Sequence, residues 1–168
     1  MKKALTTFMV LAATLFAVHT YAQPAAAGKT NFAGSWKLNV DKSDFGQMPP
    51  PSSESLVITQ TSDEIKVART SMRDQGDMSY TLTLKLDGSD VPTPAGTFPA
   101  DSPFQIVSSK AEWDGANLSV TQKTTFQGNP GSLKAKYSLS PDGKVLTIST
   151  DISLPMGDFT IKSVYDKQ

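Results

Sequence analysis

Side chains that could contact a small molecule share strand faces with apolar residues at several places in the chain. Arg69 follows Ile65 and Val67 at a spacing of two, so the three side chains point the same way if this segment is a strand. The same spacing puts Gln122 on the face of Val120. A guanidinium on an apolar face needs an anion or several hydrogen-bond acceptors, because Arg keeps its charge at ordinary pH. This pattern predicts an apolar pocket that holds the polar group of a ligand.

Three tyrosines extend this pattern. Tyr80, Tyr137 and Tyr165 fall on the apolar faces of alternating segments, and each has a phenolic oxygen that could accept a hydrogen bond from Arg69. We expect a ligand's carboxylate or other polar head to bind Arg69 as well. The alternative is that Arg69 lies at the end of its strand and reaches water with its long stem. The predicted ligand-binding residues are Arg69, Tyr80, Leu82, Leu84, Val120, Gln122, Tyr137, Ile161 and Tyr165.

Several kinds of chemistry are excluded by composition. The chain has no Cys and a single His, His19, near the N-terminus. Thiolate nucleophiles, disulfides, zinc–cysteine sites and imidazole catalysis are therefore not expected in the mature protein. The aspartate pairs Asp41/Asp44 and Asp74/Asp77 are interpreted as solvated loops rather than Ca²⁺ ligands. We expect no catalytic residues, no metal and no cofactor. Equal numbers of basic and acidic side chains, 16 of each, also argue against nucleic acid as a partner.

The elements that would position these residues are strands. Period-two alternation rich in Val, Ile, Thr and Tyr is typical of strands, and it runs through most of the chain after residue 30. The segments that show it are 35–40, 56–59, 65–68, 79–86, 104–113, 118–126, 132–139, 144–152 and 158–165. Asp87-Gly88, Asp114-Gly115 and Asp142-Gly143 stand between neighbouring segments and predict tight hairpins. The Pro-rich intervals 41–53 and 91–103 are predicted to be loops, because Pro cannot donate to a β-ladder.

Short hairpins predict an up-and-down antiparallel order. A closed barrel removes exposed sheet edges, so it suits such a chain better than a sandwich with long crossings. We therefore predict an all-β fold, an up-and-down antiparallel β-barrel of about eight to ten strands.

The N-terminus predicts export. Lys2 and Lys3 precede an apolar run over residues 4–18, and a small-residue site ends at Ala22, which is the pattern of a secretory signal peptide. The run is shorter than a membrane-spanning helix requires. We therefore expect a cleaved signal peptide over 1–22, a flexible leader over 23–30 and a single domain over 31–168. The mature protein would be secreted or periplasmic, without stable insertion in a membrane.

Both ends of the predicted domain carry family signals. Residues 31–38 (NFAGSWKL), with Gly34 and Trp36, resemble the opening of calycin-type barrels, the lipocalins and intracellular fatty-acid-binding proteins. Residues 160–166 (TIKSVYD) are similar to the last strand of the fatty-acid-binding branch, and the whole layout is similar to exported bacterial lipocalin-like proteins. The resemblance implies that Trp36 closes one barrel end and that the interior holds a small hydrophobic molecule. Ser163 stands where fatty-acid-binding proteins place a carboxylate-binding Arg.

These observations predict an exported, monomeric lipocalin-like protein that binds a small hydrophobic or amphiphilic molecule in its interior. The alternative is an envelope structural or interaction protein without a ligand, whose barrel is filled by its own side chains, as small barrels allow. An enzyme that uses Tyr and carboxylates ranks third, because no acid pair stands at a recognisable spacing.

Overall fold

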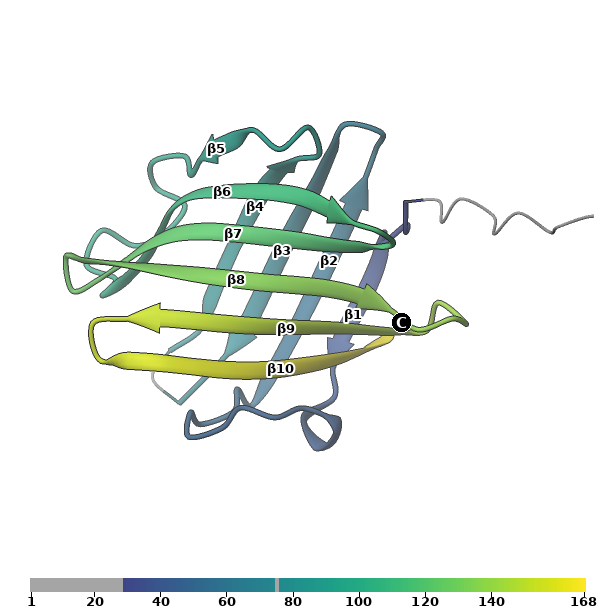
Figure 1. Cartoon of the computed structure of the whole chain (residues 1–168). Helices are drawn as coiled ribbons and strands as arrows, with labels where there is room; N and C mark the ends of the chain where they lie inside the picture. The colour runs from purple at the N-terminus through teal and green to yellow at the C-terminus, as the bar shows by residue number, and fades with distance from the viewer. Residues whose placement is uncertain (1–28, 75) are drawn as a thin grey trace, which may run out of the picture.

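The computed structural model describes residues 29–74 and 76–168, so the predicted signal peptide lies outside the described residues. Ten strands and one short 3-10 helix make up the regular structure of the described residues (Figure 1). The strands are β1 (Gly34–Leu38), β2 (Ser53–Gln60), β3 (Glu64–Met72), β4 (Met78–Lys85), β5 (Asp90–Pro92), β6 (Phe104–Asp114), β7 (Asn117–Phe126), β8 (Asn129–Leu139), β9 (Val145–Leu154) and β10 (Gly157–Lys167). The helix η1 covers Val40–Lys42, and no helix of the described residues has the length and apolarity to span a bilayer.

All strands belong to one antiparallel sheet in the order β4-β3-β2-β1-β10-β9-β8-β7-β6-β5. Consecutive strands pair with each other, except that β4 and β5 stand at the two ends of the sheet. In addition, β1 pairs with β10 and so joins the first and last parts of the chain. Figure 1 shows β6–β10 crossing in front of β1–β4, with the sheet curling round on itself. The predicted all-β, up-and-down antiparallel barrel is confirmed.

The barrel is nearly closed, because the two end strands of the sheet do not form a ladder with each other in the described residues. Side chains close this seam instead. Phe98, from the Pro-rich segment after β5, packs with Leu82 of β4 and Ile106 of β6, and its ring centroid lies 4.9 Å from that of Tyr80. Burial of these rings and aliphatic chains takes the place of backbone hydrogen bonds along the seam.

Two local predictions are wrong. The interval 91–103 is not entirely loop, because Asp90–Pro92 forms β5. This strand is the edge of the sheet and pairs only with β6, so Pro92 is not required to donate to a second neighbour. The predicted strand over 35–40 is also too long: β1 ends at Leu38, and Val40 begins η1 with 39% of its surface exposed.

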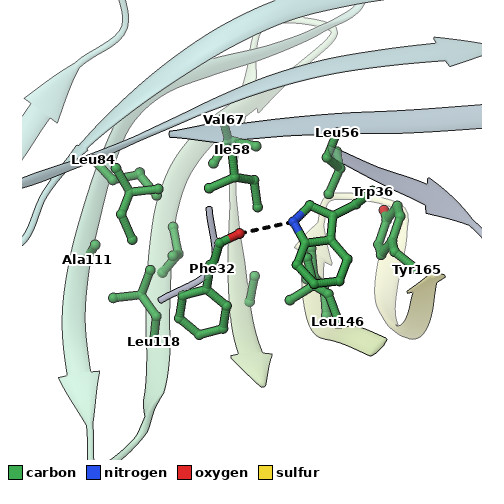
Figure 2. Packing of buried hydrophobic residues seen from close by; sticks show 14 of the residues in the cluster. Phe32, Trp36, Leu56, Ile58, Val67, Leu84, Ala111, Leu118, Leu146 and Tyr165 are labelled. Atoms are coloured by element: carbon green, nitrogen blue, oxygen red, sulfur yellow. Dashed lines mark hydrogen bonds between the residues drawn. The ribbon is translucent and has the colours of Figure 1, made fainter. Parts of the chain in front are cut away.

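One end of the barrel is filled by large side chains. Trp36 and Tyr165 are fully buried there, together with Phe32 and Leu146 (Figure 2). The Trp36 indole Nε1 donates to the Phe32 carbonyl oxygen at 3.0 Å, so the ring is buried without an unpaired donor. The sequence-based prediction that Trp36 lies in the core at a barrel end fits this arrangement.

Gly34 has a backbone reason for its identity. Its φ is +145°, and a Cβ there would lie 3.0 Å from Cε of Lys167. The Lys167 ammonium lies 5.2 Å from the centroid of the Trp36 ring, within range of a cation–π contact. The Gly-x-Trp segment therefore lets the last residues of β10 cross closely over the tryptophan.

Candidate ligand-binding site

The other half of the barrel contains a cavity of about 290 Å³. Most of its wall is apolar and comes from the inner faces of β6 and β8–β10. These aliphatic side chains are Ile106, Leu133, Ala135, Ile148, Ile152, Leu154 and Ile161. Glu54, Arg69 and Tyr80 line the cavity from β2–β4, and three further polar side chains line it from β7–β9: Gln122, Tyr137 and Thr150.

An ion pair lies in the part of the wall that β2 and β3 form. Nη2 of Arg69 donates to Oε1 of Glu54 at 2.9 Å, and the Glu54 side chain is only 5% exposed. The two residues meet because Arg69 pairs across the sheet with Leu56, two residues after Glu54. Diagonal positions of this kind lie on one face, within reach of long side chains. The buried guanidinium therefore has its counter-ion inside the protein.

Two tyrosines complete the cluster, which comprises Glu54, Arg69, Tyr80 and Tyr165. Arg69 donates from Nη1 to the Tyr80 hydroxyl at 3.2 Å and from Nη2 to the Tyr165 hydroxyl at 3.0 Å. The Tyr165 hydroxyl in turn donates to Oε1 of Glu54. Tyr80 is the direct cross-strand partner of Arg69, whereas Tyr165 arrives from β10, close to the other end of the chain.

The cluster keeps its guanidinium charged. Burial opposes the charge of Arg69, but the surrounding oxygens of Tyr80, Tyr165 and Glu54 outweigh it and hold the pKa of Arg69 well above its usual value. Burial also raises the pKa of the Tyr165 hydroxyl, and it raises the pKa of Tyr137, another residue of the cavity wall, to about 12. The ion pair with Glu54 balances the charge of Arg69 within the cluster.

Further polar atoms in the wall are not all paired. The hydroxyl of Ser71, two residues after Arg69 on the same face of β3, is buried and has no hydrogen-bond partner in the described part of the chain. Nε of Arg69 is likewise buried and has no hydrogen-bond partner in the described residues. Gln122 donates from Nε2 to the Ser109 hydroxyl at 3.0 Å. Unpaired buried polar atoms cost free energy, and the Ser71 hydroxyl and Arg69 Nε are both shielded by the side chains around them.

The rim of the cavity is formed by Met48, Arg73 and Met78. Arg73 is exposed, and its Nη1 lies 3.5 Å from the carbonyl oxygen of Pro49 in the loop before β2. Flexible Met side chains and a solvated cation therefore surround the outer part of the cavity, while the neutralised cluster lies within it.

The structure brings five of the nine sequence-predicted ligand-binding residues to the cavity wall: Arg69, Tyr80, Gln122, Tyr137 and Ile161. Tyr165 contacts Arg69 through its hydroxyl. Leu82, Leu84 and Val120 face inward but are packed in the core and do not line the cavity. Metal coordination gains no support, since no three His, Cys, Asp or Glu side chains gather into a metal site in residues 29–74 and 76–168.

Glu54 was missed by the sequence analysis, which left the counter-ion of Arg69 to tyrosines or a ligand. The structure shows that Glu54 takes this role, with Tyr80 and Tyr165 as the expected acceptors. A signal was present: Glu54 stands two residues before Leu56 and four before Ile58, on the same alternating face. Extending the predicted strand by one pair of residues would have placed a carboxylate inside the barrel.

Comparison with known proteins supports the fold. No protein-family model and no curated protein matches the chain. A secretory abundant heat soluble (SAHS) protein from Ramazzottius varieornatus is similar in structure, with a TM-score of 0.56 and 16% identity over 85% of this chain and 98% of that chain. A zebrafish ileal bile acid-binding protein, in complex with cholic acid, gives a TM-score of 0.52 and 15% identity over 82% of this chain and 98% of that chain. Both are calycin-like barrels, so the predicted lipocalin-like or fatty-acid-binding-protein-like fold is confirmed.

Proposed function

We propose that this protein binds a small amphiphilic molecule inside the barrel. The observation that carries the proposal is the cavity of about 290 Å³, whose mostly apolar wall includes Glu54, Arg69 and Tyr80 of the cluster. Ligand sites are typically concave and mostly apolar, with a few polar groups that fix orientation. The bile acid-binding protein holds an amphiphile, cholic acid, in a barrel of the same fold.

A barrel filled by its own side chains is the competing proposal. It describes the Trp36 end well, but the cavity half has no fully buried aromatic side chain comparable with Trp36 and Phe32 among the residues that line the cavity, and it encloses about 290 Å³. We also propose binding rather than catalysis, because the acidic and basic groups of the cavity, Glu54 and Arg69, are bonded to each other. The two similar structures support this reading only to the extent that one is named as a binding protein.

We also propose that the protein is exported after cleavage of a signal peptide. The support is the pattern of residues 1–22, with two lysines before an apolar run and a small-residue site at Ala22. The intact mass of protein recovered outside the cytoplasm should correspond to a chain that begins at Gln23. Recovery of the exported protein with residues 1–22 attached would contradict it. We propose a monomer, which size-exclusion chromatography with light scattering would check.

The proposed binding is tested with a neutral fluorescent probe, N-phenyl-1-naphthylamine, and a pair of adjacent substitutions. Leu133 lines the cavity, whereas Lys134, the next residue of β8, is exposed on the outside. Leu133→Trp should fill the cavity and abolish probe binding, while Lys134→Trp should leave it unchanged. Equal probe binding by both folded variants would place the probe outside the cavity. Native mass spectrometry of the purified wild-type protein, followed by organic extraction, would then identify any co-purifying molecule.

A further inference from the structure

The barrel already contains the anion that its inner guanidinium requires. Arg69 directs Nη2 to Glu54 and Tyr165 and Nη1 to Tyr80, so its terminal nitrogens are engaged by groups of the protein. Glu54 is almost fully buried, and it receives hydrogen bonds from both Arg69 and Tyr165. Arg69 and Glu54 therefore neutralise each other inside the protein, and three of the five N–H donors of Arg69 are bonded to protein groups.

A carboxylate ligand would be poorly placed in this cavity. To reach Arg69 it would have to approach Glu54, a like charge already bonded to the same guanidinium, and like charges at such distances disfavour each other. It would also give up its own hydration on entering the cavity. Of the five N–H donors of Arg69, three bond to Glu54, Tyr80 and Tyr165 in the described residues, which leaves one N–H of Nη1 and the buried N–H of Nε. The geometry thus opposes a second anion at the cluster.

Uncharged hydroxyl groups lie beside the ion pair. The Tyr80 hydroxyl accepts from Arg69, which leaves its own proton for donation. Tyr137 lines the cavity from β8, and its hydroxyl lies within electrostatic range of Arg69, Tyr80 and Glu54. The Ser71 hydroxyl has no partner in the described residues but is shielded by its neighbours. The two tyrosine hydroxyls complement an alcohol, an amide or an ester, each of which can exchange hydrogen bonds without bringing a charge.

We propose that the ligand of this cavity is a neutral amphiphile, with its hydroxyl, amide or ester group against the hydroxyls of Tyr80 and Tyr137 and its apolar part against the aliphatic side chains of β8–β10. This inference rests on the proposed function and names its ligand class. Glu54 is the specificity-determining residue: by occupying Arg69 it excludes carboxylates.

The wild-type protein tests this directly. Decan-1-ol, decanamide and decanoate share one chain length and differ in the head group, and at about pH 8 decanoate is ionised. Each is used to displace N-phenyl-1-naphthylamine. We expect the alcohol and the amide to displace the probe at concentrations about tenfold or more below those of decanoate, the scale of a lost hydrogen bond to a charged group. Decanoate binding as well as the alcohol would overturn the inference and leave the proposed function standing. Failure of the probe and of all three compounds to bind would overturn the proposed function itself.

Substitution of Glu54 sharpens the test. Glu54→Gln keeps an acceptor for Arg69 and Tyr165 but removes the negative charge, so decanoate should gain about tenfold or more relative to decan-1-ol. The matched control, Glu54→Gln with Arg69→Gln, has neither charge and should keep the preference for the alcohol. If Glu54→Gln fails to fold, the wild-type series decides alone. A folded Glu54→Gln variant with unchanged selectivity would remove Glu54 from its proposed role.

The rim offers one competing explanation. Arg73 is an exposed cation beside Met48 and Met78, and an anion could be held there with its chain inside the cavity. In that case wild-type protein would prefer decanoate, and Arg73→Gln would abolish the preference. This outcome would contradict the proposal and move head-group recognition from the inner cluster to the rim. We expect Arg73→Gln still to prefer the alcohol to decanoate.

Discussion

The two halves of the barrel are built from the same sheet but differ in how their interiors are filled. At the Trp36 end, large aromatic and aliphatic side chains meet from all sides, and the buried indole nitrogen bonds to the backbone of Phe32. In β2 and β3, Ile58 and Val67 face inward at the Trp36 end. Glu54 and Arg69 face inward further along the same two strands, at the cavity end. Polar side chains there bond to one another rather than filling space. Alternation alone thus sets which residues face inward, while their size and polarity decide whether the interior is packed or hollow.

This difference predicts a large loss of stability from deletions at the packed end. Trp36→Ala removes a fully buried ring from a region without spare volume, and it should reduce the free energy of unfolding by about 3–5 kcal/mol. Urea denaturation followed by circular dichroism measures the change. A loss near 1 kcal/mol would show that the Trp36 end is not the main source of stability.

Breaking the inner ion pair should have the next largest effect. Glu54→Ala leaves Arg69 without its counter-ion and should cost about 3 kcal/mol, the low end for a buried pair, because the Arg69 side chain is 30% exposed. Glu54→Ala combined with Arg69→Met replaces both charges with apolar groups and should recover most of the loss. If the double variant is as unstable as the single one, the cost comes from packing rather than from an unpaired charge.

A matched pair of leucines compares the two halves directly. Leu118 is 1% exposed in the packed core, whereas Leu133 is partly buried against the cavity. Leu118→Ala opens a new void, but Leu133→Ala only enlarges an existing one, so we expect the first to cost about 1–2 kcal/mol more. Thermal and urea unfolding of both variants measure the difference. Equal losses would indicate that the cavity half is as tightly packed as the other.

Alkaline pH should weaken the protein through its buried tyrosines. Burial raises the pKa of Tyr137 from about 10 to about 12, and it also raises the pKa of Tyr165. Above about pH 10 the unfolded chain ionises these groups, while the folded chain still holds their protons. The stability that depends on these protons is therefore fully present below pH 10 and is lost as the pH rises towards 12. Within that window each tyrosine lowers the free energy of unfolding by about 1.4 kcal/mol per pH unit. Unfolding at stepped pH, with Tyr137→Phe as the control for the slope, measures this loss.

The inner face of the barrel was predictable to the extent that it depends on alternation. The inward directions of Arg69, Tyr80 and Tyr137 follow from period two in their strands, and the structure agrees. The contact between Glu54 and Tyr165 was not predictable, because it joins β2 to β10 and depends on how the sheet closes. The irregular register between Ile106 and Ser108 also breaks alternation in β6, leaving Val107 exposed and both Ser108 and Ser109 buried. Local patterns carry no information on such long-range closure or bulges.

The most direct test of the account locates a ligand within the barrel. Protein labelled at isoleucine methyl groups is titrated with decan-1-ol, and intermolecular nuclear Overhauser effects are recorded. The account predicts contacts to Ile148, Ile152 and Ile161, which line the cavity, and none to Ile58 and Ile65, which lie in the packed core. Contacts to Ile58 or Ile65, or saturable binding without contacts to Ile148, Ile152 and Ile161, would contradict the claim that the hollow half of the barrel is the binding site.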